Sequence, residues 1–239
     1  MSDDHTSRSR ETVDLRIRTG ALVWMCAAQF FVAQAVVQAA WTTPFSLATN
    51  YISDLGNTVC ANYPVGGAAY VCSPLYVVMN ISFFLQGVII VVGTLLLMPL
   101  MRWGLTKRVV STLLLLTGFG MLGVGFFPEN VNNDWHVYSA ALQFITGNLA
   151  LVVLGASRIV AGANTVQRMV SILLGVTGLA ASGLFPNGYH FGFGVGGMER
   201  VAAYTFPIWL ICAGLLIIIR MRKKAEATPA KLFEACGAQ

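Results

Sequence analysis

Six apolar stretches, each long enough to cross a lipid bilayer, take up most of this chain. A transmembrane helix needs about 20 mostly apolar residues, and by that rule the spans cover about 19–43, 75–100, 108–127, 136–157, 167–185 and 199–219. Charged residues make up only 10% of the sequence, whereas soluble domains carry about a quarter. The sequence therefore predicts an all-α integral membrane protein built as a six-transmembrane-helix bundle.

The first apolar stretch could also be a secretory signal, because the alanines between positions 33 and 40 offer small residues for cleavage. It is, however, longer than the roughly 7–15 apolar residues of a signal peptide. We therefore predict an uncleaved first span. The membrane domain then covers residues 19–220, between cytoplasmic tails at 1–18 and 221–239.

The basic residues predict the orientation of the bundle, since Lys and Arg concentrate in cytoplasmic segments. All 15 of them except Arg200 fall in the two tails or in the connections after the second and fourth spans. Both termini are thus expected on the cytoplasmic side. The positive charge lies in short clusters beside apolar stretches, which indicates topology and excludes nucleic acid as a partner.

Three segments on the predicted outer side hold the ionisable residues outside the tails and inner connections. They are NYISDLGN at 50–57, FFPENVNNDWH at 126–136 and LFPNGYHFGFGVGGMER at 184–200. Ionisable groups near membrane depth are costly, so they are candidates for function. The predicted ligand-binding residues are Asn50, Ser53, Asp54, Asn57, Glu129, His136, His190, Glu199 and Arg200.

Arg200 lies in the first turn of the sixth span, where the helix dipole disfavours a positive charge. We therefore expect an anionic partner for it. Asp54 or Glu129 would give a structural ion pair, and a lipid phosphate would give a bidentate contact. The glycine-rich FGFGVGG before it is either flexible or closely packed, and no strand precedes it as a dinucleotide fingerprint requires.

The two outer histidines leave several roles open. His136 and His190 could join Asp54 and Glu199 as metal ligands, with Ser53 polarising a substrate carbonyl. No H-x-x-x-H or H-E-x-x-H spacing supports that site, so it is a weak candidate. Interfacial hydrogen bonding or general acid–base chemistry are the alternatives. If a reaction is catalysed, the candidate catalytic residues are Ser53, Asp54, His136 and Glu199.

Two of the five cysteines, Cys60 and Cys72, share the first outer loop. An oxidising compartment permits a disulfide there, so we predict a bridge between them. Cys26 and Cys212 lie within apolar stretches and are expected to be small, buried hydrophobic residues.

The motifs ISDLGN after the first span, FPEN…H at the turn between the third and fourth, and FPN…GMERVAAY before the sixth resemble the domain of unknown function 998 family of prokaryotic multi-pass membrane proteins. The resemblance covers about residues 20–220, and the matching positions are Ser53, Asp54, Gly56, Pro128, His136, Glu199 and Arg200. It implies a six-span protein in a prokaryotic plasma membrane, with no known activity. The layout is also similar to seven-span metal-dependent lipid hydrolases, but one span and the paired histidines are missing.

Three functions fit these observations. The favoured one is an outward-facing polar pocket that binds or handles the headgroup of a lipid or lipid-like small molecule. A membrane-embedded, possibly metal-dependent lipid hydrolase is the first alternative, and a small transporter is the second. Transport favours charged positions near mid-bilayer, whereas the acids here gather at one end. Membrane lipids are thus the expected partners, and the sequence assigns no cofactor and no oligomeric state.

Overall fold

The computed structural model describes residues 2–63, 70–160 and 162–237. Within these ranges, six helices are long and apolar enough to cross a membrane. This confirms the predicted all-α, six-span architecture.

The first span combines α1 (Ser2–Met25), a 3₁₀ turn η1 (Cys26–Ala28) and α2 (Gln29–Ala39). The others are α3 (Tyr76–Leu97) with η3 (Met98–Leu100), α4 (Leu105–Phe126), α5 (Asn133–Ala156), α6 (Thr165–Leu184) with η4 (Phe185–Asn187), and α7 (Gly194–Gly237). Two N-termini carry side-chain caps: Asn132 accepts a hydrogen bond from the Trp135 amide, and Asn164 forms a capping box with Gln167. Such caps satisfy amide groups that the helix itself leaves unpaired.

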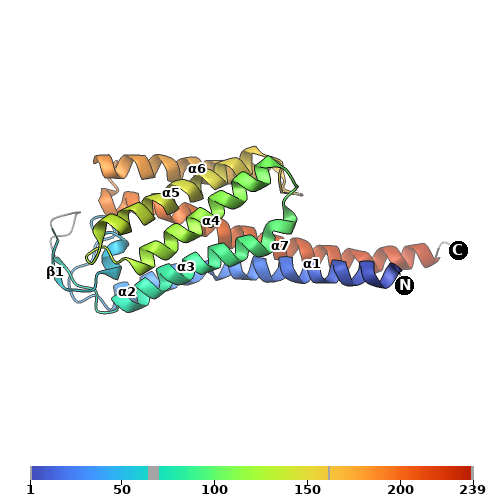
Figure 1. The fold of residues 1–239 in the computed structure, drawn as a ribbon, viewed down its shortest axis with the longest axis horizontal. Coiled ribbons are helices and arrows are strands. Elements are labelled where there is room, and N and C mark those ends of the chain that lie inside the picture. The colour runs from blue at the N-terminus through green and yellow to red at the C-terminus, as the bar shows by residue number, and fades with distance from the viewer. Residues whose placement is uncertain (1, 64–69, 161, 238–239) are drawn as a thin grey trace.

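The helical segments at both ends are longer than the apolar stretches. Helix α1 begins at Ser2, inside the segment predicted as a polar tail, and α7 continues to Gly237 through the other. Residue 1 and residues 238–239 of the predicted tails lie outside the described residues. Both helices extend past the bundle at the same end (Figure 1).

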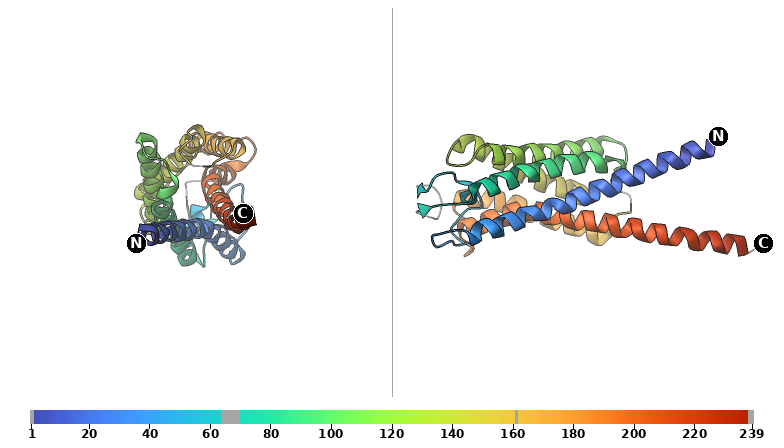
Figure 2. Two further views of the ribbon diagram at one scale, coloured as in Figure 1. Left: turned by 90° about the vertical axis from the view of Figure 1, so that its right-hand side faces the viewer. Right: turned by 90° about the horizontal axis from the view of Figure 1, so that it is seen from below.

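The six spans close into a ring in chain order. Each helix packs against the next, and α7 completes the ring by packing against α1, as the view along the bundle shows (Figure 2). Close contacts depend on small residues. A Cβ atom at Gly87 of α3 would lie 2.7 Å from the carbonyl oxygen of Gly118 on α4. Small residues of this kind let helices approach closely in lipid.

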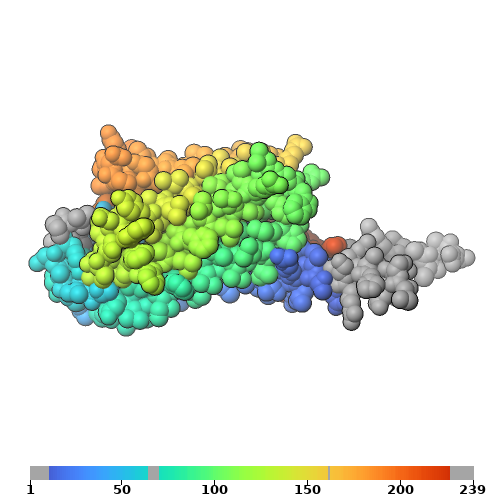
Figure 3. Space-filling model, in the orientation of Figure 1, coloured from blue at the N-terminus to red at the C-terminus, as the bar shows by residue number. Residues whose placement is uncertain are grey.

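The long connection between α2 and α3 caps one end of the ring (Figure 3). It contains a 3₁₀ turn, η2 (Ser53–Gly56), and a short antiparallel pair, β1 (Ala61–Asn62) and β2 (Tyr70–Val71). We call this end, with the α4–α5 and α6–α7 turns, the acidic end. The opposite end carries the Lys and Arg residues of the connections and tails, and we call it the basic end.

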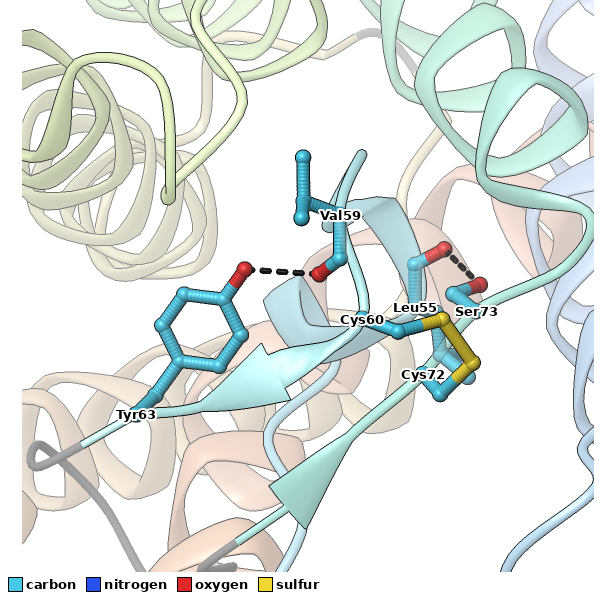
Figure 4. Close-up of a disulfide and its surroundings, with 6 residues drawn as sticks. All are labelled: Leu55, Val59, Cys60, Tyr63, Cys72 and Ser73. Carbon is cyan, nitrogen blue, oxygen red and sulfur yellow. Dashed lines mark hydrogen bonds between the residues drawn. A yellow bond between two sulfur atoms is a disulfide. The ribbon is translucent and has the colours of Figure 1, made fainter.

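A disulfide joins Cys60 to Cys72 across the short strand pair, as the sequence predicted. The prediction that Cys26 and Cys212 are buried was wrong, since both are exposed on the bundle. The hydroxyl of Ser73 donates to the carbonyl oxygen of Leu55 at 2.7 Å, and that of Tyr63 donates to Val59 at the same distance (Figure 4). Ser73 therefore ties the disulfide-linked hairpin directly to the η2 turn.

Candidate functional site

The ISDLGN turn is buried within the acidic end. All six residues from Ile52 to Asn57 are buried, and Asp54 keeps only 4% of its surface exposed. A polar turn of this composition would lie in solvent in most loops. Here α3 holds it from one side, because the Asn80 side chain donates to the Gly56 carbonyl at 2.8 Å. The turn is thus part of the interior.

Arg200, in the first turns of α7, holds the loop that precedes this turn. Its Nη1 donates to the carbonyl oxygens of Leu47 at 3.0 Å, Asn50 at 2.7 Å and Gly196 at 2.9 Å. The centroid of the Phe45 aromatic ring lies 5.8 Å from the guanidinium carbon of Arg200. In the described part of the chain, these carbonyls take the place of the expected ion pair with Asp54 or Glu129. Its Nε and Nη2 remain buried without a partner.

Two glycines allow the loop to approach α7 this closely. The Gly196 amide donates to the Ala48 carbonyl at 2.9 Å. A Cβ atom at Gly196 would lie 2.1 Å from the Asn50 carbonyl oxygen. Gly194 has a φ of +74°, and a Cβ atom there would lie 2.2 Å from the Ala48 carbonyl oxygen. No side chain fits at such separations. The glycine-rich segment is therefore a closely packed seat for the loop.

Two acids of the motifs, Glu199 and Asp54, accept hydrogen bonds from the backbone of the turn and of the loop before it. Glu199 accepts from the Ile52 amide at 2.5 Å across the chain. Asp54 accepts from its own loop, from the Asn50 side chain at 3.1 Å and the Tyr51 amide at 2.9 Å. These bonds pair backbone amides that would otherwise be buried unsatisfied, so both side chains help to fix the turn.

A cavity of about 40 Å³ lies beneath the turn, inside the ring. Its polar lining comes from four separate elements: Ser53 of η2, Gln86 of α3, His136 and Gln143 of α5, and Glu199 of α7. The remaining walls are apolar and largely aromatic, with Phe30, Phe83, Phe144 and Phe206 among them. An apolar cavity with a few converging polar groups is the usual form of a small-molecule site.

The imidazole of His136 uses one nitrogen, Nδ1, in a hydrogen bond within the protein and leaves the other, Nε2, for a ligand. Its Nδ1 lies 2.8 Å from the carbonyl oxygen of Phe127. A carbonyl can only accept, so Nδ1 carries the proton, and in the neutral ring Nε2 is left as an acceptor. His136 is buried and lines the cavity. It can thus accept a hydrogen bond from a ligand.

Glu129 lies at the α4–α5 turn beside Ser53. The pKa of its carboxyl is raised to about 7, mainly by burial and also by the negative charge of Asp54, while a hydrogen bond with the Ser53 side chain opposes both effects. Burial also raises the pKa of Asp54, against the lowering effects of Asn50, the Tyr51 amide and Arg200. The Tyr51 hydroxyl has a pKa of about 12, raised by burial and the nearby acids. Burial at the acidic end therefore favours the protonated forms of these groups.

Several polar atoms of this end are buried without a hydrogen-bond partner. The acceptors are Asn57 Oδ1, Asn80 Oδ1 and Glu129 Oε2, and the donors include Gln86 Nε2 besides the two Arg200 nitrogens. Buried polar groups are nearly always paired. A cluster of unpaired ones is therefore a place where water or a ligand would be stabilised.

The predicted residues separate into three groups. Ser53, His136 and Glu199 meet at the cavity. Asp54 and Asn57 belong to the turn above it, and Asn50, Glu129 and Arg200 lie around that turn. His190 lies in the α6–α7 turn and is not part of the cavity lining, although its Nε2 is buried without a partner. Among the residues described, no group of three or more His, Cys, Asp or Glu side chains could hold a metal ion.

Sequence reasoning missed Gln86, Gln143 and Asn80. Each is a polar residue within an apolar span, and Gln86 also accepts from the Gln29 side chain at 3.1 Å. Polar residues in a transmembrane helix usually face the bundle interior. Applying that rule to the second and fourth spans, as well as to the outer turns, would have found the two glutamines.

A family model described as "Protein of unknown function (DUF998)" matches residues 25–216, most of the chain. This is the family that the three motifs resemble. No curated protein and no solved structure matches the chain.

Proposed function

We propose a function for this chain, which belongs to the DUF998 family of proteins of unknown function: it binds the headgroup of a membrane amphiphile beneath the Ile52–Asn57 turn, at the acidic end of the bundle. The observation that carries the proposal is the cavity where Ser53, His136 and Glu199 converge below that turn. Polar groups from η2, α5 and α7 meet aromatic walls there, as a ligand with a polar head and an apolar body requires.

The unpaired atoms indicate the chemistry of the headgroup. Glu129 and the two asparagines offer acceptors, while Arg200 offers two donors. Guanidinium groups bind phosphate well, and acceptors beside carboxylates suit an ammonium group with N–H bonds. A zwitterionic headgroup with a phosphate and a primary ammonium satisfies both sets. We therefore favour an aminophospholipid.

The size of the cavity requires the turn to move. At roughly 10–15 Å³ per water molecule, 40 Å³ holds about three waters, whereas ligand pockets usually enclose about 300–1,000 Å³. The described structure thus represents a closed state in this proposal. The loop at 46–57 is the cover, and its contacts with Arg200 and Glu199 are the ones that opening would break.

The test is a thermal-unfolding screen of the full chain, purified in detergent and supplied with lipids of different headgroups. Phosphatidylethanolamine has both groups, phosphatidylcholine lacks the N–H donors, and phosphatidylglycerol lacks the ammonium. We expect phosphatidylethanolamine to raise the unfolding temperature most. A His136→Gln variant should lose most of this increase, and the matched His190→Gln variant should keep it.

Equal stabilisation by the three lipids, or equal losses in the two histidine variants, would contradict the proposal. Release of a hydrolysed lipid product under these conditions would instead favour the lipid-hydrolase alternative. The two substitutions make the same chemical change, at His136 in the cavity and at His190 in the α6–α7 turn, so a difference between them reports on the cavity.

A further inference from the structure

A second cavity, about 440 Å³ in volume, lies at the basic end of the ring. It is about ten times the size of the cavity beneath the turn and within the usual range for ligand pockets. Its walls come from α1, α3, α5, α6 and α7 and from the segment before α6. Nothing in the function proposed above uses it.

Most of the lining is apolar. Deep in the cavity, Trp24 and Trp209 meet edge to face with ring centroids 5.5 Å apart. The Trp209 indole donates to Ser171 at 2.7 Å, which fixes its orientation. From Trp209 to Arg220 the α7 helix rises by about 16 Å at 1.5 Å per residue, roughly half of the hydrocarbon thickness of a bilayer. The cavity is thus deep enough for part of an acyl chain.

Its charged lining is of one sign. Arg168 and Arg220 line the cavity, and among the residues whose side chains the structure describes no acidic one does. Arg168 donates to the carbonyls of Gly155 at 3.0 Å and Ala156 at 3.1 Å, and Arg220 donates to Gln167. Both arginines are only half-buried. Each guanidinium has five N–H donors, and those not used in the bonds above can donate to a ligand. The N-terminus of α6 adds the positive end of its dipole beside them.

We infer that this cavity binds an anionic phospholipid, with one acyl chain against Trp24 and Trp209 and its phosphate on Arg168 and Arg220. The juxtaposition of an apolar chamber with two arginines, and with no acid in the described lining, selects an amphiphile with a negative headgroup. The site is separate from the acidic end, where carboxylates predominate. The ring therefore holds one lipid site at each end, with opposite charge preferences.

Tryptophan quenching tests this site directly. The full chain, with Trp41, Trp103 and Trp135 changed to Phe, is placed in phosphatidylcholine nanodiscs so that only Trp24 and Trp209 report. Phosphatidylglycerol with brominated acyl chains is then titrated in, with brominated phosphatidylcholine as the comparison. We expect saturable quenching, and half-saturation by the anionic lipid at a clearly lower mole fraction than by the zwitterionic one.

Two arginine variants with the same charge change form the matched pair. Arg220→Gln should raise the half-saturating fraction of the anionic lipid about fivefold to tenfold, because one partly screened charge-assisted contact is lost. Arg222→Gln, exposed and outside the cavity lining, should leave it nearly unchanged. An Ala213→Phe substitution, which fills the cavity, should abolish saturable quenching while the protein retains a cooperative unfolding transition.

Three results would overturn the inference. They are equal half-saturation by the two brominated lipids, an equal effect of Arg222→Gln and Arg220→Gln, and full relief of quenching by inorganic phosphate alone. The second would mean general attraction to the basic end, and the third would mean that the acyl chain contributes nothing. None of them affects the proposal for the acidic end, which is tested with a different lipid and different residues.

Discussion

Glu129, in the α4–α5 turn, occupies a position that disfavours its negative charge. Its carboxyl lies beside Asp54, and one of its oxygens is buried without a partner. Burial and the neighbouring charge both favour the protonated form, which is why its pKa rises to about 7. The residue therefore titrates near neutral pH, where a headgroup ammonium could replace the proton.

Glu129→Gln tests this at the scale of the residue. The pKa of Glu129 is raised in the folded protein. Protonation of Glu129 therefore stabilises the fold fully below about pH 4.5, the ordinary pKa, and this contribution is lost as the pH rises through about 7. Between pH 5 and pH 8 the wild type should lose about 1–3 kcal/mol more stability than the variant. Thermal unfolding in detergent at the two pH values measures the difference.

Asp134→Asn is the control, because Asp134 is an exposed acid close by in the same segment. It should leave the pH dependence of the wild type unchanged. The account of Glu129 would be wrong if Glu129→Gln retained the wild-type pH dependence in full.

At this scale, the sequence predicted which residues would lie near one another better than which atoms they would contact. Ser53, His136 and Glu199 belong to segments predicted to lie on one side of the bundle, and they line one cavity. The carbonyl partners of Arg200 could not be predicted, because they depend on a backbone conformation more than 140 residues away in the sequence. Spacing within one helix carries no information about such contacts.

At the scale of elements, the loop at 46–57 and the first turns of α7 form one packed unit. Arg200 and Glu199 both bond to the loop backbone, and two glycines remove the side chains that would separate the elements. The disulfide-linked hairpin supports the turn from the other side through Ser73. The unit closes the acidic end of the ring.

Gly196→Ala tests this packing. The new methyl group would lie 2.1 Å from the Asn50 carbonyl oxygen, so the loop or the helix must shift. We expect a loss of about 1–3 kcal/mol in stability, the usual cost of forcing an extra carbon into a packed interior. Thermal unfolding measures the loss, and protease sensitivity of the 46–57 loop should increase.

The matched control is Gly183→Ala on α6, where a Cβ atom would meet nothing within 4 Å. This substitution should be neutral or slightly stabilising, since alanine favours helix. If Gly196→Ala proved as stable as Gly183→Ala, the loop could not be seated on α7 as described.

The helices themselves were the most predictable elements, since apolar length alone locates a transmembrane span. The ends of two helices differ from the prediction, because apolar length does not indicate whether a polar segment continues a helix. The polar residues of α1 and α7 continue the helix beyond the apolar stretch. The burial of ISDLGN was also unpredictable, because its composition is that of an ordinary solvent-exposed turn.

At the scale of the whole molecule, the ring encloses a small polar cavity at one end and a larger apolar one at the other. The charge difference between the ends follows from the positions of the acids and bases along the chain, and the sequence alone predicted it. The closure of the ring by α7 against α1 depends on tertiary packing, which the sequence pattern does not specify. In both proposals, the polar groups that line the two cavities inside the apolar bundle bind the headgroup of a lipid.

The most direct test of the central claim is an experimental structure of the full chain in nanodiscs containing phosphatidylethanolamine. We predict headgroup density beside Ser53, His136 and Glu199, in a cavity enlarged beyond 40 Å³ by movement of the 46–57 loop. The contrary result is a cavity of unchanged size that holds water alone, with lipid only on the outer surface of the ring.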